Sequence, residues 1–163
     1  MYKTVVFDLD GTLLNTLTDL ADAGNRLCRK YGWPTHERQA YRYFVGNGIP
    51  KLVERLAPAD QRTPAVLEAA LADFKRDYGQ HLRDTTAPYP GIPEMLAKLK
   101  ANGVQLAVFS NKADALAKEV VKDYFGTQYF TIVRGQMTGV APKPAAEGTN
   151  ALLQALHADP AST

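Results

Sequence analysis

Apolar residues follow two different rhythms along the chain. Short continuous runs, rich in β-branched and aromatic side chains, occur near the start and again in the second half of the sequence. Such runs are typical of strands that are buried on both faces of a parallel sheet. They predict strands over residues 5–9, 104–109 and 129–133.

The middle of the chain has the three- and four-residue spacing of amphipathic helices instead. Everything from Thr16 to about Thr86 follows this spacing, so an all-helical segment interrupts the chain after the first strand. Strands and helices then alternate, which indicates parallel strands joined by right-handed crossovers. The predicted helices cover residues 17–31, 37–44, 49–56, 63–83, 92–101, 113–124 and 144–156.

Composition narrows the class of protein. The 163 residues include 19 basic and 17 acidic side chains and no basic block, so the charge pattern does not favour nucleic acid as a partner. The single cysteine, Cys28, cannot form an internal disulfide, and no apolar run approaches the length of a membrane span. The start of the chain leads into a strand rather than a signal peptide. We expect a cytoplasmic protein with no membrane partner, in which Cys28 is a small core residue.

The first predicted strand leads directly into two carboxylates, Asp8 and Asp10. Side chains at i and i+2 point to the same side of a strand, and two like charges that close are costly unless a cation lies between them or they share a proton. The pair suits phosphoryl transfer through an aspartyl-phosphate, in which one carboxylate attacks phosphorus, the other moves a proton, and a hard divalent cation neutralises charge. A turn with two solvated acids is the plainer alternative.

Polar residues follow the acid pair and recur after the strand at 104–109. Gly11 lets the backbone approach a ligand, and Thr12 offers an N–H and a hydroxyl to a phosphate oxygen. Ser110 and Asn111 stand where the predicted strand ends and a helix begins, a position that favours anions. A plain helix cap explains Ser110 and Asn111 equally well.

Lys143 lies between Pro142 and Pro144, which stiffen its backbone and fix the direction of its ammonium group. A lysine at a helix N-terminus is unfavourable for the helix dipole, which is tolerable if the ammonium serves an anion. A solvated loop lysine is the alternative.

Together these residues resemble the haloacid dehalogenase-like hydrolases, most of which are magnesium-dependent phosphatases. Residues 7–13 are similar to motif I of that family, Ser110 to motif II and Lys143 to motif III. The resemblance implies that Asp8 is the nucleophile, that Asp10 is the general acid/base, and that Lys143 steadies the negative charge on nucleophile and phosphate. It also implies a Mg²⁺ ion held by Asp8 and Asp10. The phosphate-binding set that it suggests is Gly11, Thr12, Ser110, Asn111 and Lys143.

The resemblance further implies a three-layer, Rossmann-like α/β core with a parallel sheet. Residues 1–15 and 87–163 would form this core, and residues 16–86 would form an inserted all-α cap domain. Phe44-Val45-Gly46-Asn47-Gly48 and the Asn111-Lys112 pair are similar to the phosphoglycolate phosphatase branch. Gly46, Asn47 and Gly48 are therefore candidates for substrate selection, with a simple helix–helix turn as the alternative. The expected partner is a small phosphorylated metabolite such as 2-phosphoglycolate.

The family pattern ends in a pair of acidic residues, motif IV, which completes the magnesium site and has no counterpart here. Glu147 and Asp159 are the only acids after Lys143. We therefore expect this chain to be a truncated form of a longer phosphatase, with an incomplete core and reduced metal affinity and turnover. The strand at 3–9 would then be an exposed edge that invites self-association.

Two alternatives to a hydrolase stay open from the sequence. One is a catalytically inactive remnant of the family that binds phosphate or a partner protein. The other is a sugar phosphomutase of the same superfamily. Metal-dependent hydrolysis of a generic phosphomonoester, abolished by Asp8→Asn, separates a hydrolase from a remnant, and a product assay tests for the mutase.

Overall fold

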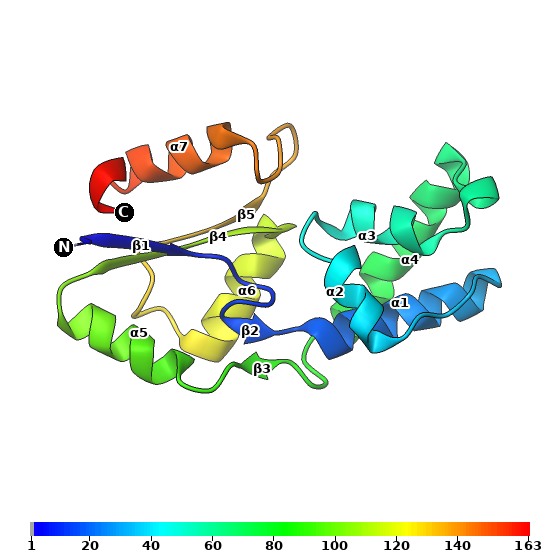
Figure 1. The fold of residues 1–163 in the computed structure, drawn as a ribbon, viewed down its shortest axis with the longest axis horizontal. Helices are drawn as coiled ribbons and strands as arrows, with labels where there is room; N and C mark the ends of the chain where they lie inside the picture. Colours follow the sequence, from blue (N-terminus) through cyan, green and yellow to red (C-terminus); the bar gives the residue numbers. More distant parts are fainter. Residues whose placement is uncertain (1) are drawn as a thin grey trace. The chain divides into compact units, whose positions relative to one another are not determined.

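The computed structural model describes residues 2–163, which divide into two compact units. One unit contains residues 2–14 and 88–163, and the other contains residues 15–87, so the second is inserted into the first. We call them the sheet unit and the helical unit (Figure 1).

A parallel three-stranded sheet forms the centre of the sheet unit. The strands lie in the order β1-β4-β5, so β4 has a neighbour on each side and β1 lies at an edge of the sheet that the described residues form. Val5 pairs with Leu106 and Phe7 with Val108, and Leu106 and Val108 are fully buried. The strands are β1 (Thr4–Phe7), β4 (Gln105–Ala113) and β5 (Ile132–Gln136).

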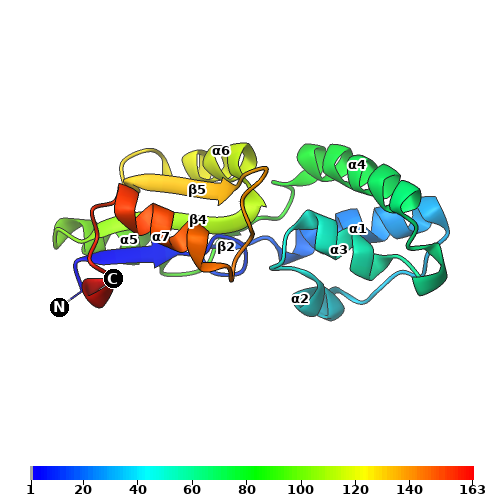
Figure 2. The same ribbon diagram turned by 90° about the horizontal axis from the view of Figure 1, so that it is seen from above.

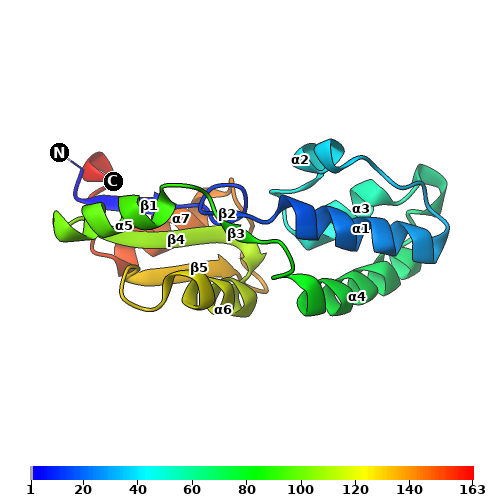
Figure 3. The ribbon, with the colours of Figure 1, turned by 90° about the horizontal axis from the view of Figure 1, so that it is seen from below.

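Helices cover both faces of this sheet. The helix α7 lies on one face, and α5 and α6 lie on the other (Figures 1 and 3). Ala107 and Phe109 of β4 pack with Leu152 and Leu156, which belong to α7 and its C-cap. This is the three-layer α/β arrangement with a parallel sheet that the sequence predicts. The helices are α5 (Ile92–Ala101), α6 (Asp114–Phe125) and α7 (Ala146–Ala155), followed by the 3₁₀ turn η3 (Pro160–Ser162).

The helical unit is built around the antiparallel pair α1 and α4 (Figure 2). Arg26 of α1 donates to both carboxylate oxygens of Asp77 on α4, at 2.7–3.0 Å. Cys28 is buried in this unit, and burial raises the pKa of its thiol to about 11, as expected of a core residue. The elements are α1 (Leu17–Tyr31), η1 (Arg38–Ala40), α2 (Tyr41–Phe44), α3 (Ile49–Leu56), η2 (Ala59–Gln61) and α4 (Pro64–His81). Across residues 2–163 we find no helix whose length and apolar character would let it cross a bilayer.

Two short strands mark the points where the chain passes from one unit to the other. They are β2 (Leu14–Asn15) and β3 (Ala87–Pro88), which pair with each other. The sequence does not predict these two strands, because two residues are too few to show a periodicity.

A buried carboxylate fixes the segment that leads into β3. Asp19, in the first turn of α1, is only 2% exposed. Its two oxygens accept hydrogen bonds from the N–H and the hydroxyl of both Thr85 and Thr86, over 2.5–3.2 Å. These neutral donors satisfy a buried charge within the helical unit.

All three strand predictions are wrong in their boundaries. β1 covers Thr4–Phe7 rather than residues 5–9. β4 continues to Ala113 rather than ending at Phe109. β5 covers Ile132–Gln136 rather than residues 129–133. Phe130 lies outside β5, and its ring packs edge-on against the rings of Phe7 and Phe125. Among the helices, the predicted 37–44 segment is divided into η1 and α2, while 17–31, 49–56 and 92–101 have the predicted bounds. The other three, α4, α6 and α7, differ from the prediction by one or two residues at their ends.

Candidate functional site

Asp8 and Asp10 lie just beyond the end of β1, where the chain enters a tight turn. The carbonyl oxygen of Leu9 accepts main-chain hydrogen bonds from Leu13 at 3.0 Å and Leu14 at 3.1 Å. Gly11 in this turn has a φ of 80°, a conformation that favours glycine. The Leu9 side chain is fully buried. Because side chains alternate along extended backbone, the two carboxylates lie on the side opposite to Leu9.

The main-chain N–H of Thr12, predicted to face a phosphate oxygen, is used within the turn itself, as is that of Gly11. The Gly11 N–H donates to the carbonyl of Leu14 at 2.8 Å, and the Thr12 N–H donates to that of Leu9 at 3.3 Å. Thr12 is exposed, so its hydroxyl is the group that it presents to a ligand.

Lys143 contacts the first of the two acids. Its Nζ donates to Oδ1 of Asp8 at 2.9 Å and to the carbonyl oxygen of Phe109 at 2.6 Å. The ammonium also lies over the Phe109 ring, 5.4 Å from the centroid, a cation–π contact that further fixes its position. The predicted nucleophile and the predicted charge-stabilising lysine, 135 residues apart in sequence, are therefore in direct contact.

Asn111 holds the main chain of Lys143. Its Nδ2 donates to the Lys143 carbonyl at 3.1 Å, and its Oδ1 accepts from the Lys143 N–H at 2.8 Å. From the sequence, this amide is predicted to bind phosphate. In the structure its two ends engage the backbone beside Lys143, so Asn111 positions the lysine.

The expected helix N-terminus at Ser110 is wrong. Ser110 lies inside β4, and α6 begins four residues later, at Asp114. Ser110 is buried, and its Oγ accepts a hydrogen bond from the N–H of Lys112 at 3.1 Å. The hydroxyl keeps its own proton as a donor. Its predicted role at a phosphate therefore depends on this hydroxyl rather than on a helix dipole.

Lys112 is the site residue that the sequence analysis missed. Its Nζ lies 3.0 Å and 3.4 Å from the two oxygens of Asp10. The only signal in the sequence is its place in the Asn111-Lys112 pair, because a lysine after a serine and an asparagine at a strand end otherwise suggests a solvated residue. Its side chain is 4% exposed.

Each acid thus has a lysine partner, and the two pairs differ in exposure. The side chains of Asp8 and Lys143 are 43% and 26% exposed. Those of Asp10 and Lys112 are 20% and 4% exposed. A ligand can reach the Asp8–Lys143 pair more easily, whereas the Asp10–Lys112 pair forms the inner part of the site.

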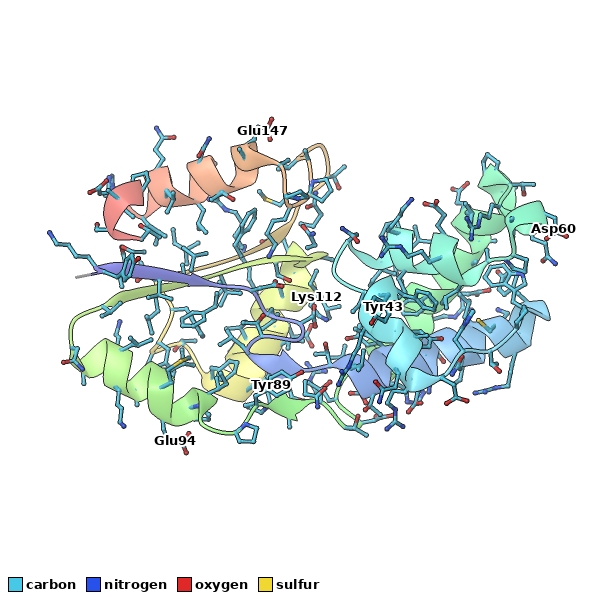
Figure 4. The ribbon with its side chains drawn as sticks, in the orientation of Figure 1. Tyr43, Asp60, Tyr89, Glu94, Lys112 and Glu147 are labelled. Atoms are coloured by element: carbon cyan, nitrogen blue, oxygen red, sulfur yellow. The ribbon has the colours of Figure 1, made fainter. Side chains whose placement is uncertain are left out.

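The acid pair fits a hard cation that takes few protein ligands. Mg²⁺ commonly binds through one or two carboxylates together with waters and substrate phosphate. Asp8 supplies one carboxylate, and the second protein ligand that the resemblance implies is the backbone carbonyl of Asp10. Within residues 2–163 no group of three or more Asp, Glu, His or Cys side chains gathers that could hold a metal ion. Glu147 points away from the sheet on α7 (Figure 4). Asp159 caps η3 by accepting from the Ala161 N–H.

The candidate selectivity loop belongs to the helical unit. It joins α2 to α3, and Gly46 and Gly48 have φ values of 100° and 84°. The side chain of Asn47 accepts a hydrogen bond from Arg55 at 2.9 Å, and Arg55 also donates to the Phe44 carbonyl at 2.8 Å. Arg55 therefore holds the loop in shape, while Gly46 and Asn47 are exposed.

Comparison with known proteins identifies the family to which these residues point. Residues 5–163 match a family model described as haloacid dehalogenase-like hydrolase. A phosphoglycolate phosphatase of Thiobacillus denitrificans is 33% identical over 145 residues, which are 87% of this chain and 64% of that protein. One from Neisseria meningitidis is 34% identical over 88% of this chain and 62% of its own length. The chain thus spans less than two thirds of these curated relatives.

Solved structures resemble the chain over nearly its whole length. The crystal structure of a predicted phosphoglycolate phosphatase from Haemophilus somnus has a TM-score of 0.87 and 26% sequence identity. It covers 99% of this chain, which in turn covers 74% of that structure.

Proposed function

This chain belongs to the haloacid dehalogenase-like hydrolases, and we propose that it hydrolyses phosphomonoesters through an aspartyl-phosphate at Asp8. The proposed substrate is a small phosphorylated metabolite, with 2-phosphoglycolate as the first candidate. The names of the relatives in Thiobacillus and Neisseria support this choice.

One observation carries the proposal. A partly exposed carboxylate, Asp8, touches a lysine ammonium, and a second carboxylate follows two residues later. Phosphoryl transfer needs a nucleophile, positive charge beside the phosphate and a group that moves a proton. Asp8, Lys143 and Asp10 supply one of each.

The reaction divides into two displacements. In the first, an oxygen of Asp8 bonds to phosphorus as the ester oxygen leaves, and Asp10 gives that oxygen its proton. In the second, a water oxygen attacks the phosphorus of the aspartyl-phosphate, Asp10 takes the proton of the water, and the bond to Asp8 breaks. Asp10 ends as it began, so protons balance over the cycle.

The residues of this chain supply part of the stabilisation that the negative charge on the phosphate needs in these steps. Uncatalysed phosphomonoester hydrolysis is among the slowest biological reactions, so charge stabilisation must supply much of the rate. Lys143 faces the nucleophile, and the hydroxyls of Ser110 and Thr12 are the proposed donors to phosphate oxygens. Asp8 and Asp10 would hold a divalent cation such as Mg²⁺, which when bound supplies further positive charge against the phosphate.

The helical unit is the proposed source of substrate selection. Gly46 and Asn47 form an exposed loop whose backbone amides suit a small polar ligand. As a cap, this unit would exclude water from the phosphate during reaction.

A second candidate function has one observation in its favour. Among the described residues, no third metal-ligating side chain joins Asp8 and Asp10. This suits a protein that binds phosphate without hydrolysing its esters. Such a protein would present the edge of β1 to a second copy of the chain. The sugar phosphomutase alternative stays a prediction, for which a glucose-phosphate product assay is the test.

The test is phosphate release from 2-phosphoglycolate and from p-nitrophenyl phosphate, with and without Mg²⁺. We expect metal-dependent turnover that Asp8→Asn lowers by at least about 10³-fold, because the nucleophile is lost. The control is Asp60→Asn, an exposed position in η2, which should stay within about twofold of the unaltered chain. Turnover that survives Asp8→Asn contradicts the covalent mechanism. Its absence from the unaltered chain favours the phosphate-binding alternative.

A further inference from the structure

Lys112 is the most buried of the four charged side chains in the site. Its side chain is 4% exposed, and its ammonium contacts both oxygens of Asp10. Lysine is almost never fully buried unless it is paired. A buried ion pair is a weak source of stability, and apolar side chains of similar size often serve a core better. The pair therefore calls for an explanation other than stability.

The irregular end of β4 gives Lys112 its direction. Phe109 pairs with Arg134 and Ala113 with Gln136, so four steps along β4 (109 to 113) match two along β5 (134 to 136). Extra residues in one strand form a bulge, and bulges turn side chains in new directions. Ser110, Asn111 and Lys112 occupy this bulge and contact, in turn, the Lys112 N–H, the Lys143 backbone and Asp10.

The neighbouring strand holds this bulge tightly. A Cβ at Gly135 of β5 would clash with the carbonyl oxygen of Lys112 and with the backbone of Asp114. The Gly135 N–H donates to Oδ1 of Asp114 at 2.9 Å. The backbone of Lys112 is thus anchored on a rigid strand, as an orienting residue requires.

We propose that Lys112 is a positioning residue that fixes the carboxylate of Asp10 in the direction from which it transfers protons. This inference rests on the proposed function. Asp10 lies in a turn beyond the end of β1, and a carboxylate there has rotational freedom unless a partner removes it. The ion pair with Lys112 connects the Asp10 carboxylate to β4. Direct binding of substrate phosphate suits Lys143 better, since Lys143 is the more exposed of the two lysines.

The consequence depends on the leaving group. An alkoxide such as that of 2-phosphoglycolate needs a proton as its bond to phosphorus breaks, whereas p-nitrophenolate leaves without one. kcat/KM reports the steps up to departure of the leaving group, so misplacement of Asp10 lowers kcat/KM for the alkyl ester alone.

The test compares Lys112→Met with Lys122→Met, a matched change at an exposed position on α6. We expect Lys112→Met to lower kcat/KM for 2-phosphoglycolate by about tenfold or more and to leave that for p-nitrophenyl phosphate within about threefold. Lys122→Met should change neither. An equal loss with both esters overturns the proposal, because general damage or lost phosphate binding acts on both.

A second measurement does not require turnover. Unfolding of the chain with Lys112→Met, with Asp10→Asn and with both changes gives the coupling between the two side chains. We expect the double variant to lose less than the two single losses combined, by about threefold to tenfold in the unfolding equilibrium constant. Additive losses overturn the contact. If the unaltered chain hydrolyses neither ester, the proposed function fails, while the coupling still decides whether Lys112 holds Asp10.

Discussion

The sheet unit and the helical unit hold their aspartates in opposite ways. In the helical unit, the N–H and hydroxyl groups of Thr85 and Thr86 occupy both oxygens of Asp19, which is 2% exposed. In the sheet unit, Asp8 and Asp10 each face a lysine and keep part of their surface open to solvent.

This difference separates a structural carboxylate from a reactive one. Neutral donors that surround Asp19 satisfy its charge completely and leave no oxygen for a ligand. An ammonium group on one side of Asp8 balances charge while the other side remains accessible. Both arrangements come from residues far apart in sequence, so the type of partner, rather than its distance along the chain, distinguishes them.

The largest effect should come from removing the positive charge beside Asp8. Lys143→Met should lower the hydrolysis rate by about 10²–10³-fold with alkyl and aryl esters alike, because nucleophile and phosphate lose a stabilising charge. The free energy of unfolding should change by no more than about 1 kcal/mol, since the ion pair is partly exposed. Steady-state kinetics and urea unfolding measure the two. A variant that is unstable but fully active would reverse the roles assigned to the two units.

Asp19→Ala should have the reverse outcome. Four donors of Thr85 and Thr86, those of Thr86 buried, lose their acceptor, so we expect a loss of about 3 kcal/mol in unfolding free energy. Amide hydrogen exchange should show lost protection at Thr85 and Thr86. Asp22→Ala, an exposed position on the same helix, is the control and should cost less than about 0.5 kcal/mol. Equal effects at the two positions would mean that Asp19 has no special structural role.

A pair of glycines sharpens the comparison further. A Cβ at Gly24 would come within 2.5 Å of the buried Tyr41 ring, and one at Gly148 within 2.5 Å of the Phe109 ring. Each change to alanine should cost about 1 kcal/mol, because overpacking outweighs the better helix propensity of alanine. Only Gly148→Ala should also lower activity, by about threefold to tenfold, since the ring and the carbonyl oxygen of Phe109 both contact the Lys143 ammonium. A loss of activity with Gly24→Ala alone would contradict this assignment.

The smallest expected effect is on stability at low pH, through Asp73 in the helical unit. Hydrogen bonds from Lys30 and Tyr31 lower the pKa of Asp73 from its ordinary value of 3.8 to about 2. A lowered pKa in the folded state adds stability above pH 3.8, and that contribution is lost as the pH falls towards 2. Asp73→Asn should therefore flatten the decline in stability of the chain across this window. NMR titration of the Asp73 carboxyl measures the pKa, and an ordinary value would remove the prediction.

The sequence predicted much of the fold because local signals agree with it. The helices at 49–56 and 92–101 have the predicted bounds, since a glycine precedes each and a proline stands in its first turn. Tertiary contacts determine what was missed. The bulge in β4 depends on close contact between Gly135 and the backbone of Lys112, which no local pattern reveals.

The candidate site shows the same division. Asp8 and Asp10 follow an apolar strand, and Lys143 lies between two prolines, so the pattern marks all three. Lys112 follows a serine and an asparagine and gives no such signal, because its burial depends on how β4 leaves its regular register. The roles of these residues in catalysis stay predictions until they are measured.

The most direct test of the central claim is to trap the covalent intermediate. Acid quenching during turnover of p-nitrophenyl phosphate, reduction of the aspartyl-phosphate with borohydride and peptide mass spectrometry identify the modified residue. The account predicts conversion of Asp8 to homoserine, with Asp10 unmodified and no conversion in Asp8→Asn. Hydrolysis that proceeds with no modification at Asp8, or with modification at another residue, would contradict it.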